Sequence, residues 1–408
     1  MKRLDKIKAY TLWLILSLAL GFIGGVCGAA FSKSVELVTN IRNEHSFLIY
    51  LLPLGGLVSV TIYKLLQING ANTLSVFNAS KNNTPLPHGL SVAIFGGGVL
   101  SHLFGASVGR EGAALQIGGG VASVLSHLFR LDDKSRRVML LCGMAALFSA
   151  LFGTPLAAAV FVIEIIMTRL CFTSIIPIFI SSLTAFKVAA ILGTHAERFN
   201  IGDIPYFSLP IILKTAIIII ACVIVCLVWC KGLHLAEHIA KKLLKNDFLR
   251  IAVGGIIIIV LTLLISSNDY NGGGVDVIAH VFDGSVKYEA FALKLLFTII
   301  CVSAGYKGGE IVPTLFIGAT LGGALALILN LPIGFGAAIG IAVLFSASTK
   351  CPIATILLCC EMFGFGSILF TTITAIISVI LSHFYKGIYN NSNHIITYTL
   401  NKFKKDSR

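Results

Sequence analysis

The chain has 408 residues, of which 56% are hydrophobic and 12% are charged, and its formal net charge is +13. Soluble domains are about a quarter charged, so this composition excludes an ordinary soluble protein and predicts a polytopic membrane protein. Lysine and arginine cluster beside apolar runs and are not interleaved with aromatic residues, which argues against nucleic-acid binding and favours the cytoplasmic edge of a membrane. The basic segments are the N-terminus, residues 131–137, residues 240–250 and the C-terminus.

Three segments are long and apolar enough to span a membrane outright, since a spanning helix needs about 20 apolar residues. They are 9–31, which is too long for the apolar part of a signal peptide, 171–192 and 210–230. The other apolar segments are shorter or are interrupted by Gly and Pro: 90–104, 113–130, 138–152, 154–166, 311–329, 333–349, 353–366 and 368–382. Such segments predict helices that end part-way through the membrane, where they are buried or line a cavity.

Cysteine and histidine residues give no sign of a metal site. Most of the ten cysteines lie inside apolar segments, and we interpret them as small core residues rather than a disulfide framework. His88, His102 and His127 are separately spaced and have no acidic companions, so we expect them at helix ends or interfaces. The sequence has no nucleotide-binding loop and no soluble domain after Lys404, so we expect no cofactor and no regulation by a bound nucleotide.

The two halves of the chain resemble each other. FSALFGTPLAAAVFVIE at 148–164 aligns without gaps with FSASTKCPIATILLCCE at 345–361, at a constant offset of 197 residues. Upstream, Glu111 aligns with Glu310 at an offset of 199. Paired interrupted segments in corresponding positions predict a transporter of inverted repeats with its site at the repeat interface.

The boundary between the repeats is expected in the polar stretch 193–209. We therefore predict one membrane domain over residues 1–408. Its parts are a first repeat at 9–192, a second repeat at 210–390 and a basic cytoplasmic tail at 391–408.

Two glutamates stand in glycine-rich breaks before apolar helices, in GREG at 109–112 and in GGEIVP at 308–313. Such a break presents unpaired backbone N–H groups at the positive end of a helix dipole, which forms an anion site. An ionised glutamate occupies that site and a protonated one leaves it, so one side chain can couple proton movement to anion movement. Acids inside a membrane are functional by default, and we favour this role over simple helix capping.

The remaining charged residues near these breaks have plainer interpretations. Arg110 is expected to tie the loop or its backbone carbonyls, and it could pair with Glu111. Glu164 and Glu361 end apolar helices. We expect them to be solvated or paired, with a proton relay as the alternative.

GREG, GGEIVP, the repeated PLAAAVFVIE and PIATILLCCE segments, and Ile388-Tyr389 after the last apolar helix resemble the CLC family of anion channels and proton-coupled anion antiporters. The resemblance covers nearly the whole chain. It implies an all-α polytopic fold of two inverted-topology repeats with broken, tilted helices, assembled as a homodimer with one pore in each subunit. It also implies a gating glutamate at Glu111 and a central anion site. The candidate anion-binding residues are Gly70, Ala71, Asn72, Thr73, Gly109, Arg110, Gly112, Gly309, Ile311, Val312 and Tyr389.

Departures from the family pattern indicate a branch. The GSGIP loop, whose serine holds chloride in the family, is GANTL at 70–74, with Ala71 and Asn72 both candidates for the place of the serine. Ile165 replaces the internal proton glutamate of the antiporters, and Ala113 replaces the proline after GREG. Glu310 holds a position that is apolar in chloride-transporting members.

These departures are similar to the fluoride/proton antiporter branch, in which the second-repeat glutamate takes part in transport. Val312 stands where that branch often has threonine. A small anion loses its hydration at great cost and needs several short, charge-assisted donors. Helix-end amides and the Tyr389 hydroxyl could supply them, with Asn72 or Thr73 adding side-chain donors.

The sequence therefore predicts a secondary active transporter, not an enzyme, that exports fluoride in exchange for protons. The alternatives are a chloride/proton antiporter or passive chloride channel of the same family, and a membrane enzyme with Glu111 and Glu310 as an acid/base pair. The expected partners are the anion, protons, a second copy of the chain and the lipid bilayer, with no nucleic acid. We expect a bacterial inner membrane and cytoplasmic termini.

Overall fold

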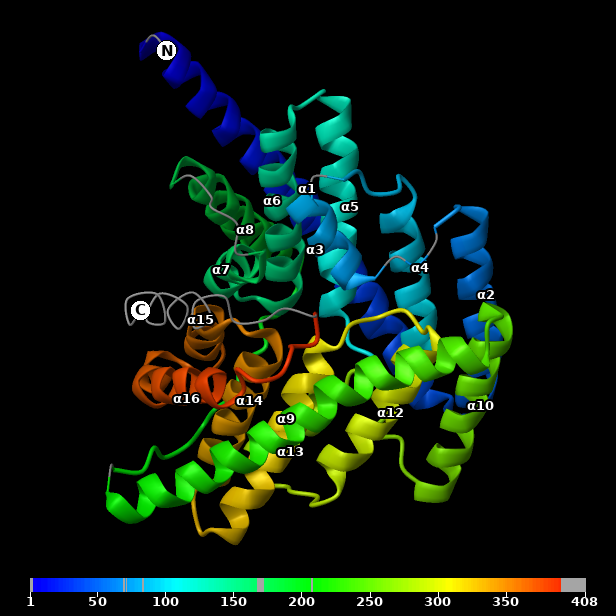
Figure 1. Ribbon diagram of the computed structural model, residues 1–408, viewed down its shortest axis with the longest axis vertical. Helices are drawn as coiled ribbons and strands as arrows, with labels where there is room; N and C mark the ends of the chain where they lie inside the picture. The colour runs from blue at the N-terminus through cyan, green and yellow to red at the C-terminus, as the bar shows by residue number, and fades with distance from the viewer. Residues whose placement is uncertain are drawn as a thin grey trace, which may run out of the picture. The chain divides into compact units, whose positions relative to one another are not determined.

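The computed structural model describes residues 3–68, 70, 72–82, 84–166, 172–206 and 208–389. Ala71 and the predicted basic tail at 391–408 lie outside them. The described residues form α-helices, joined by short turns and by 3-10 helices at Ser46–Leu51 and Phe365–Ser367 (Figure 1). The α-helices are α1 Arg3–Glu44, α2 Leu52–Leu65, α3 Thr73–Asn82, α4 Leu90–Leu103, α5 Glu111–Leu128, α6 Asp133–Phe152, α7 Pro155–Ile166, α8 Phe172–Ile191, α9 Leu209–Leu243, α10 Asp247–Ile265, α11 Val275–Phe282, α12 Ala290–Ala304, α13 Ile311–Ile328, α14 Ile333–Thr349, α15 Pro352–Phe363 and α16 Ile368–Leu381.

Seven helical segments in the described part of the chain are long and apolar enough to cross a membrane. They include α1, α8 and α9, which confirms the three spans predicted from hydropathy, and α10, which the sequence interpretation did not single out. The shorter predicted segments are also helices, and their ends agree with the structure to within a few residues, except that α6 begins five residues earlier. Short helices such as α7 and α15 have 12 residues each, too few to cross a membrane outright.

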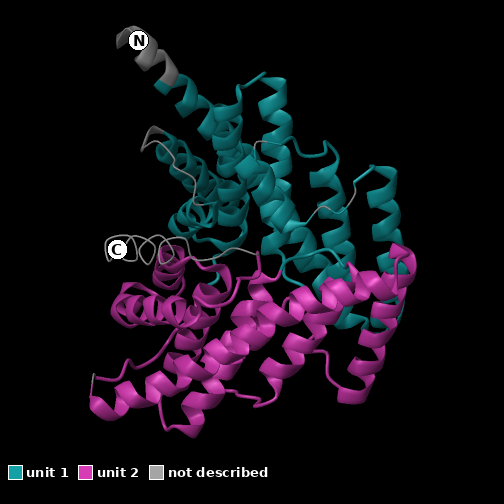
Figure 2. Ribbon diagram, in the orientation of Figure 1, with its two compact units in different colours: residues 1–197, 306–309 teal, residues 198–305, 310–408 magenta. Residues whose placement is uncertain are grey.

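The chain forms two compact units (Figure 2). Unit 1 contains Met1–Glu197 together with Tyr306–Gly309, and unit 2 contains Arg198–Gly305 and Glu310–Arg408. The first crossing from unit 1 to unit 2 lies within the polar stretch 193–209. Periodicity along the sequence could not predict that residues 306–309 belong to unit 1, because these residues contact residues about 200 to 250 positions earlier in the chain.

The same series of elements occurs in both units. In unit 1 it is α4, α5, α6 and α7, and in unit 2 it is α12, α13, α14 and α15. Helices α5 and α13 both have 18 residues, whereas α6 has 20 residues and α14 has 17. The offset between the repeats is therefore 200 residues at the start of α5 and 197 at the start of α7. This register pairs Arg110 with Glu310, so the sequence alignment of Glu111 with Glu310 is wrong by one residue.

Glycine allows the paired helices of each unit to touch through their backbones. A methyl group added to Gly118 of α5 would lie 2.1 Å from the carbonyl oxygen of Gly143 in α6. In unit 2, a methyl group on Gly318 of α13 would lie 2.4 Å from the carbonyl oxygen of Gly340 in α14. Small residues permit this close approach, which is the usual way that membrane helices pack.

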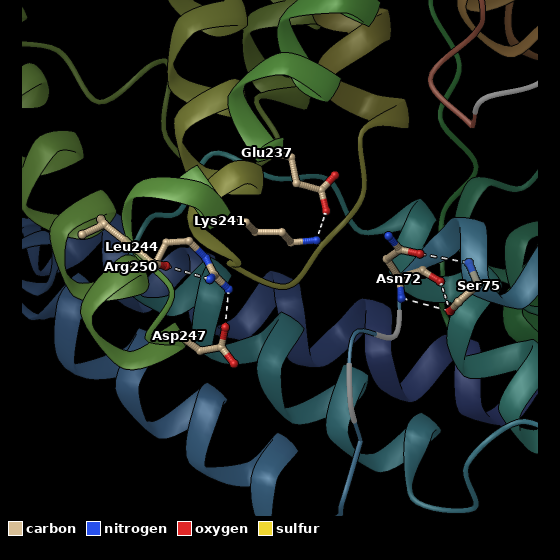
Figure 3. A network of polar contacts seen from close by, with 7 residues as sticks. All are labelled: Asn72, Ser75, Glu237, Lys241, Leu244, Asp247 and Arg250. Carbon is tan, nitrogen blue, oxygen red and sulfur yellow. Dashed lines mark hydrogen bonds and ion pairs between the residues drawn. The ribbon is translucent and has the colours of Figure 1, made fainter. Parts of the chain in front are cut away.

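Two of the basic segments contain turns between helices. In unit 1, residues 131–137 contain the α5–α6 turn, and this turn lies at the same end of the unit as the N-terminal part of α1 (Figures 1 and 2). In unit 2, residues 240–250 contain the α9–α10 turn, where Arg250 donates to the Leu244 carbonyl and pairs with Asp247 (Figure 3).

Gly118→Ala is expected to destabilise the protein, because the added methyl group forces α5 away from α6. Overpacking of this kind costs about 1–3 kcal/mol. The measurement is the midpoint of thermal unfolding of detergent-solubilised protein, followed by intrinsic fluorescence. Gly96→Ala in α4 is the matched control, since its methyl group would have no neighbour closer than 3.8 Å. An unchanged midpoint for Gly118→Ala would contradict the backbone contact.

Candidate functional site

The two glycine-rich breaks are joined by a reciprocal backbone contact inside unit 1. The Gly109 N–H donates to the Gly309 carbonyl at 2.7 Å, and the Gly309 N–H donates to the Gly109 carbonyl at 2.6 Å. Any side chain on Gly309 would collide with the start of α5, because its Cβ would lie 2.3 Å from the Gly112 nitrogen. The glycines of GREG and GGEIVP therefore allow the backbones of these two segments to approach each other closely.

Residues 306–309 are fixed in unit 1 by further contacts. The Tyr306 hydroxyl donates to the Leu52 carbonyl at 3.1 Å, and the Lys307 N–H donates to the Ser101 hydroxyl at 3.1 Å. The Lys307 ammonium lies 4.1 Å from the centre of the Tyr63 ring, a cation–π contact. The segment thus holds Gly309 against GREG through both its backbone and its side chains.

Glu111 is the first residue of α5 and its side chain is fully buried, with 0% exposed. One carboxylate oxygen, Oε1, lies 3.4 Å from Nε of Arg110. The other oxygen, Oε2, is buried and has no hydrogen-bond partner. A buried carboxylate oxygen without a donor is unfavourable when it is charged, so this position favours either protonation or a change of side-chain position.

Arg110 is shared between two carboxylates. Besides Glu111, its guanidinium pairs with Glu197 at 2.6 Å and donates to the Ser32 hydroxyl on α1 at 3.2 Å. These partners hold the arginine in place and offset its charge. The arrangement agrees with the tying role expected for Arg110, and it leaves little of its charge for a bound anion.

The GANTL loop leads into α3, and its side chains have different hydrogen-bond partners. Asn72 and Ser75 form a reciprocal cap, in which the Ser75 N–H donates to Asn72 Oδ1 at 2.9 Å and the Asn72 N–H donates to Ser75 Oγ at 3.0 Å (Figure 3). Thr73, the first residue of α3, is 3% exposed. Gly70 has a positive φ of 64°, and a Cβ added to it would meet no atom within 4 Å, so it shapes the turn rather than permitting a close contact.

Gln116 is a site residue that the sequence interpretation did not identify. Its Nε2 donates to the Thr73 hydroxyl oxygen at 3.2 Å and to the Gly112 carbonyl at 3.3 Å. It therefore connects the GANTL loop to the first turn of α5. The sequence offered one sign of this role: Gln116 lies four residues after Gly112, and residues at that spacing share a helix face. Because Thr73 accepts from Gln116, its own hydroxyl proton can be donated elsewhere.

In unit 2, Glu310 is the N-cap residue of α13. Its carbonyl accepts hydrogen bonds from the N–H of Thr314 at 3.0 Å and from the Thr314 hydroxyl at 2.7 Å, and Trp229 of α9 donates to that hydroxyl at 3.0 Å. The Glu310 carboxylate oxygen Oε2 is buried without a hydrogen-bond partner. The helix start is thus held by the backbone and by Thr314 rather than by the carboxylate. Trp229 and Thr314 were not identified from the sequence.

Ile311, Val312 and Tyr389 are also in unit 2. Ile311 and Val312 are buried in the first turn of α13. The segment before Tyr389 is held by the Ile388 N–H, which donates to the Ser348 carbonyl at 2.9 Å, and by His234, whose Nε2 lies 3.1 Å from the Ile388 carbonyl oxygen. Tyr389 itself is 5% exposed. This segment therefore packs on α9 and α14.

Two histidines lie where the sequence predicted them, whereas the surroundings of Glu164 differ in part from the prediction. His102 and His127 lie in the last turns of α4 and α5, which confirms the expected positions at helix ends. Glu164 is buried at the end of α7 and is therefore not solvated.

Comparisons with known proteins cover almost the whole chain. The sequence profile of a family described as voltage gated chloride channel matches residues 54–383. A chloride/fluoride channel protein of Pseudomonas syringae pv. tomato is 33% identical over 402 residues, which cover 95% of this chain and 88% of the relative. An H(+)/Cl(-) exchange transporter of Vibrio cholerae is 29% identical in an alignment 425 positions long, which covers 93% of this chain and 89% of the relative.

Solved structures show the same fold. The crystal structure of a CLC-type fluoride/proton antiporter matches with a TM-score of 0.87 and 28% identity, over 95% of this chain and 98% of that chain. A slow cyanobacterial Cl−/H+ antiporter matches with a TM-score of 0.80 over 96% of this chain and 98% of that chain. Its 20% identity supports a shared fold alone.

Thr73→Val keeps the shape of the side chain but removes the hydroxyl that is available to an anion. We expect anion affinity, measured by isothermal titration calorimetry, to fall roughly five- to tenfold, as for the loss of one hydrogen bond. Asn72→Ala is the contrasting variant. It removes the α3 cap and costs about 1 kcal/mol of stability, but it should leave the affinity unchanged. The opposite pattern would assign the donor to Asn72.

Proposed function

The chain belongs to the CLC family of voltage gated chloride channels, and from this premise we propose that it is a secondary active transporter that exports fluoride in exchange for entering protons. Membership confirms the family resemblance and the all-α polytopic fold with inverted-topology repeats that the sequence predicted. We propose further that it acts as a homodimer in a bacterial inner membrane, with both termini cytoplasmic.

The observation that carries the proposal is the pair of glutamates at the starts of α5 and α13. Each has one buried carboxylate oxygen without a hydrogen-bond partner. The first N–H groups of a helix have no partner within the helix and carry a partial positive charge. A carboxylate and a permeant anion compete for such a position, and protonation of the carboxylate decides the competition.

Glu111 is proposed as the gate. When ionised, it occupies the N-terminal end of α5 and excludes an anion by charge and by volume. When protonated, it loses its attraction for Arg110 and for the helix end, so the side chain can move and an anion can take its place. Arg110 also pairs with Glu197, and this second contact can keep the loop in position while the gate moves.

Glu310 is proposed as a second proton-linked group. Its ionised form repels a neighbouring anion, and its neutral form can donate a hydrogen bond to one. Because Thr314 and Trp229 hold the start of α13, the charge of Glu310 can change without loss of the helix start. In the resemblance drawn from the sequence, this acid separates the fluoride branch from chloride-transporting members.

Fluoride as the cargo is supported by Glu310 and by two relatives, the Pseudomonas chloride/fluoride channel protein and the solved CLC-type fluoride/proton antiporter. A small anion also needs strong donors in place of its water, and Thr73 can contribute one. Chloride/proton exchange is the second candidate. It is supported by the name of the Vibrio relative, which is 29% identical over 93% of this chain.

Glu111→Gln is expected to abolish proton-coupled exchange, because the amide is nearly isosteric with the carboxylic acid but cannot release a proton. The measurement is fluoride efflux from liposomes with an electrode, together with proton influx by a pH dye. The mutant should show no flux or a leak without protons. Glu36→Gln, on an exposed residue of α1, is the matched control and should exchange normally. Intact coupling in Glu111→Gln would reject the gating role.

Glu310→Ala is expected to lower fluoride/proton exchange at least tenfold while leaving the folded protein intact, since a buried carboxylate adds little net stability once its desolvation is counted. Flux is compared with wild type at equal amounts of folded protein, judged by size-exclusion chromatography, for fluoride and for chloride separately. If fluoride flux is unchanged, Glu310 has no transport role. If chloride is exchanged faster than fluoride by the wild type, the second candidate function replaces the first.

A further inference from the structure

The α5–α6 turn of unit 1 borders a basic cavity, open to the surface, that the proposed transport mechanism does not use. The cavity has a volume of about 560 Å³ and is lined by His127, Leu128, Arg130, Leu131 and Arg136. Three of these five side chains are basic, and none is acidic. The turn begins where α5 ends at Leu128 and finishes where α6 begins at Asp133.

The charges around this cavity are only partly offset. Arg136 lies 3.6 Å from Asp133, whose side chain is largely exposed. Within the described part of the chain, Arg130 has no carboxylate within 4.0 Å. The ring of His88 packs edge-on against His127, with 5.7 Å between ring centres. The cavity therefore presents a positive surface on which at least one guanidinium has its full charge available.

Arg130 occupies a backbone position that does not suit arginine. Its φ of 50° lies in the left-handed region. The Arg130 N–H donates to the His127 carbonyl and the Leu131 N–H to the Ser126 carbonyl, the pattern of a helix end that usually has glycine or asparagine at this place. Such an outlier is a reason to look for a function of the side chain.

The second repeat provides an internal comparison. Asn330 ends α13 with the same pattern and a φ of 51°, through bonds from Asn330 to Leu327 and from Leu331 to Ala326. Asparagine tolerates the left-handed region better than arginine. The α13–α14 turn LNLPIG at 329–334 has no basic residue. The fold thus accepts asparagine at this position, and the basic cavity is particular to the first repeat.

Apolar side chains border the basic cavity. Leu128 and Phe129 are 69% and 53% exposed at the end of α5. Unit 1 contains several helices that are long and apolar enough to cross a membrane, and exposed apolar side chains beside basic ones suit the boundary between acyl chains and polar headgroups. Basic pockets of this kind on the cytoplasmic side of membrane proteins bind anionic headgroups. A free phosphate ion would gain nothing from Leu128 and Phe129.

We propose that the α5–α6 cavity binds the phosphate group of an anionic phospholipid, with Arg130 and Arg136 on the phosphate and the acyl chains along Leu128 and Phe129. The bonds are charge-assisted, between guanidinium and phosphate oxygens. This lipid site does not depend on which anion the protein transports.

The test compares bound lipid on the full-length protein, by native mass spectrometry, after titration with phosphatidylglycerol or phosphatidylcholine. Wild type should retain phosphatidylglycerol preferentially. Arg130→Asn should weaken that binding on the order of tenfold, while its unfolding midpoint without lipid stays equal or rises, because asparagine suits the backbone. Lys134→Gln is the matched control, since it removes one charge from an exposed side chain in the first turn of α6 that does not line the cavity.

Three results would overturn the proposal. The first is equal retention of phosphatidylglycerol by Arg130→Asn and wild type. The second is an equal loss in Lys134→Gln, which would indicate general surface charge. The third is displacement of phosphatidylglycerol by inorganic phosphate at similar concentration, which would make the ligand a soluble phosphate rather than a lipid.

Discussion

Backbone polar groups inside a membrane must find partners within the protein, and this constraint acts most strongly where a helix begins part-way through the bilayer. In unit 1, Gly109 and Gly309 exchange two hydrogen bonds, so the backbone N–H and carbonyl groups of both residues have partners. The same contact brings the chain before α5 against the segment that leads into α13. The N–H groups that begin α5 itself are left for other partners, and these groups are what an anion can use.

The chemistry of the two glutamates follows from this arrangement. At the start of α5 a carboxylate lies at a helix end that can also hold an anion, and at the start of α13 the carboxylate is not needed to hold the helix. Gln116 adds a further link, because it ties the first turn of α5 to Thr73. Movement of the GANTL loop is therefore restricted by the same helix that carries Glu111.

Hydropathy and glycine spacing predicted most helices and both breaks, because these depend on local sequence. The one-residue error between Glu111 and Glu310 has a different origin. Helix α6 is three residues longer than α14, and an alignment anchored downstream of that difference cannot give the register upstream. Gln116, Trp229 and Thr314 were not identified because their importance comes from partners on other helices. The placement of residues 306–309 in unit 1 depends on contacts between segments that are distant in sequence.

The pairing of Arg110 with Glu197 has a consequence for turnover. An arginine without a carboxylate partner beside Glu111 would hold an anion strongly, and a strongly held ion leaves slowly. Here Glu197 lies 2.6 Å from the guanidinium, so a second carboxylate besides Glu111 offsets its charge. An anion at this place would then meet neutral dipoles, such as amide and hydroxyl groups, in place of a fixed opposite charge. Its dwell time is set by these weaker contacts, which suits a protein that must release what it has just bound.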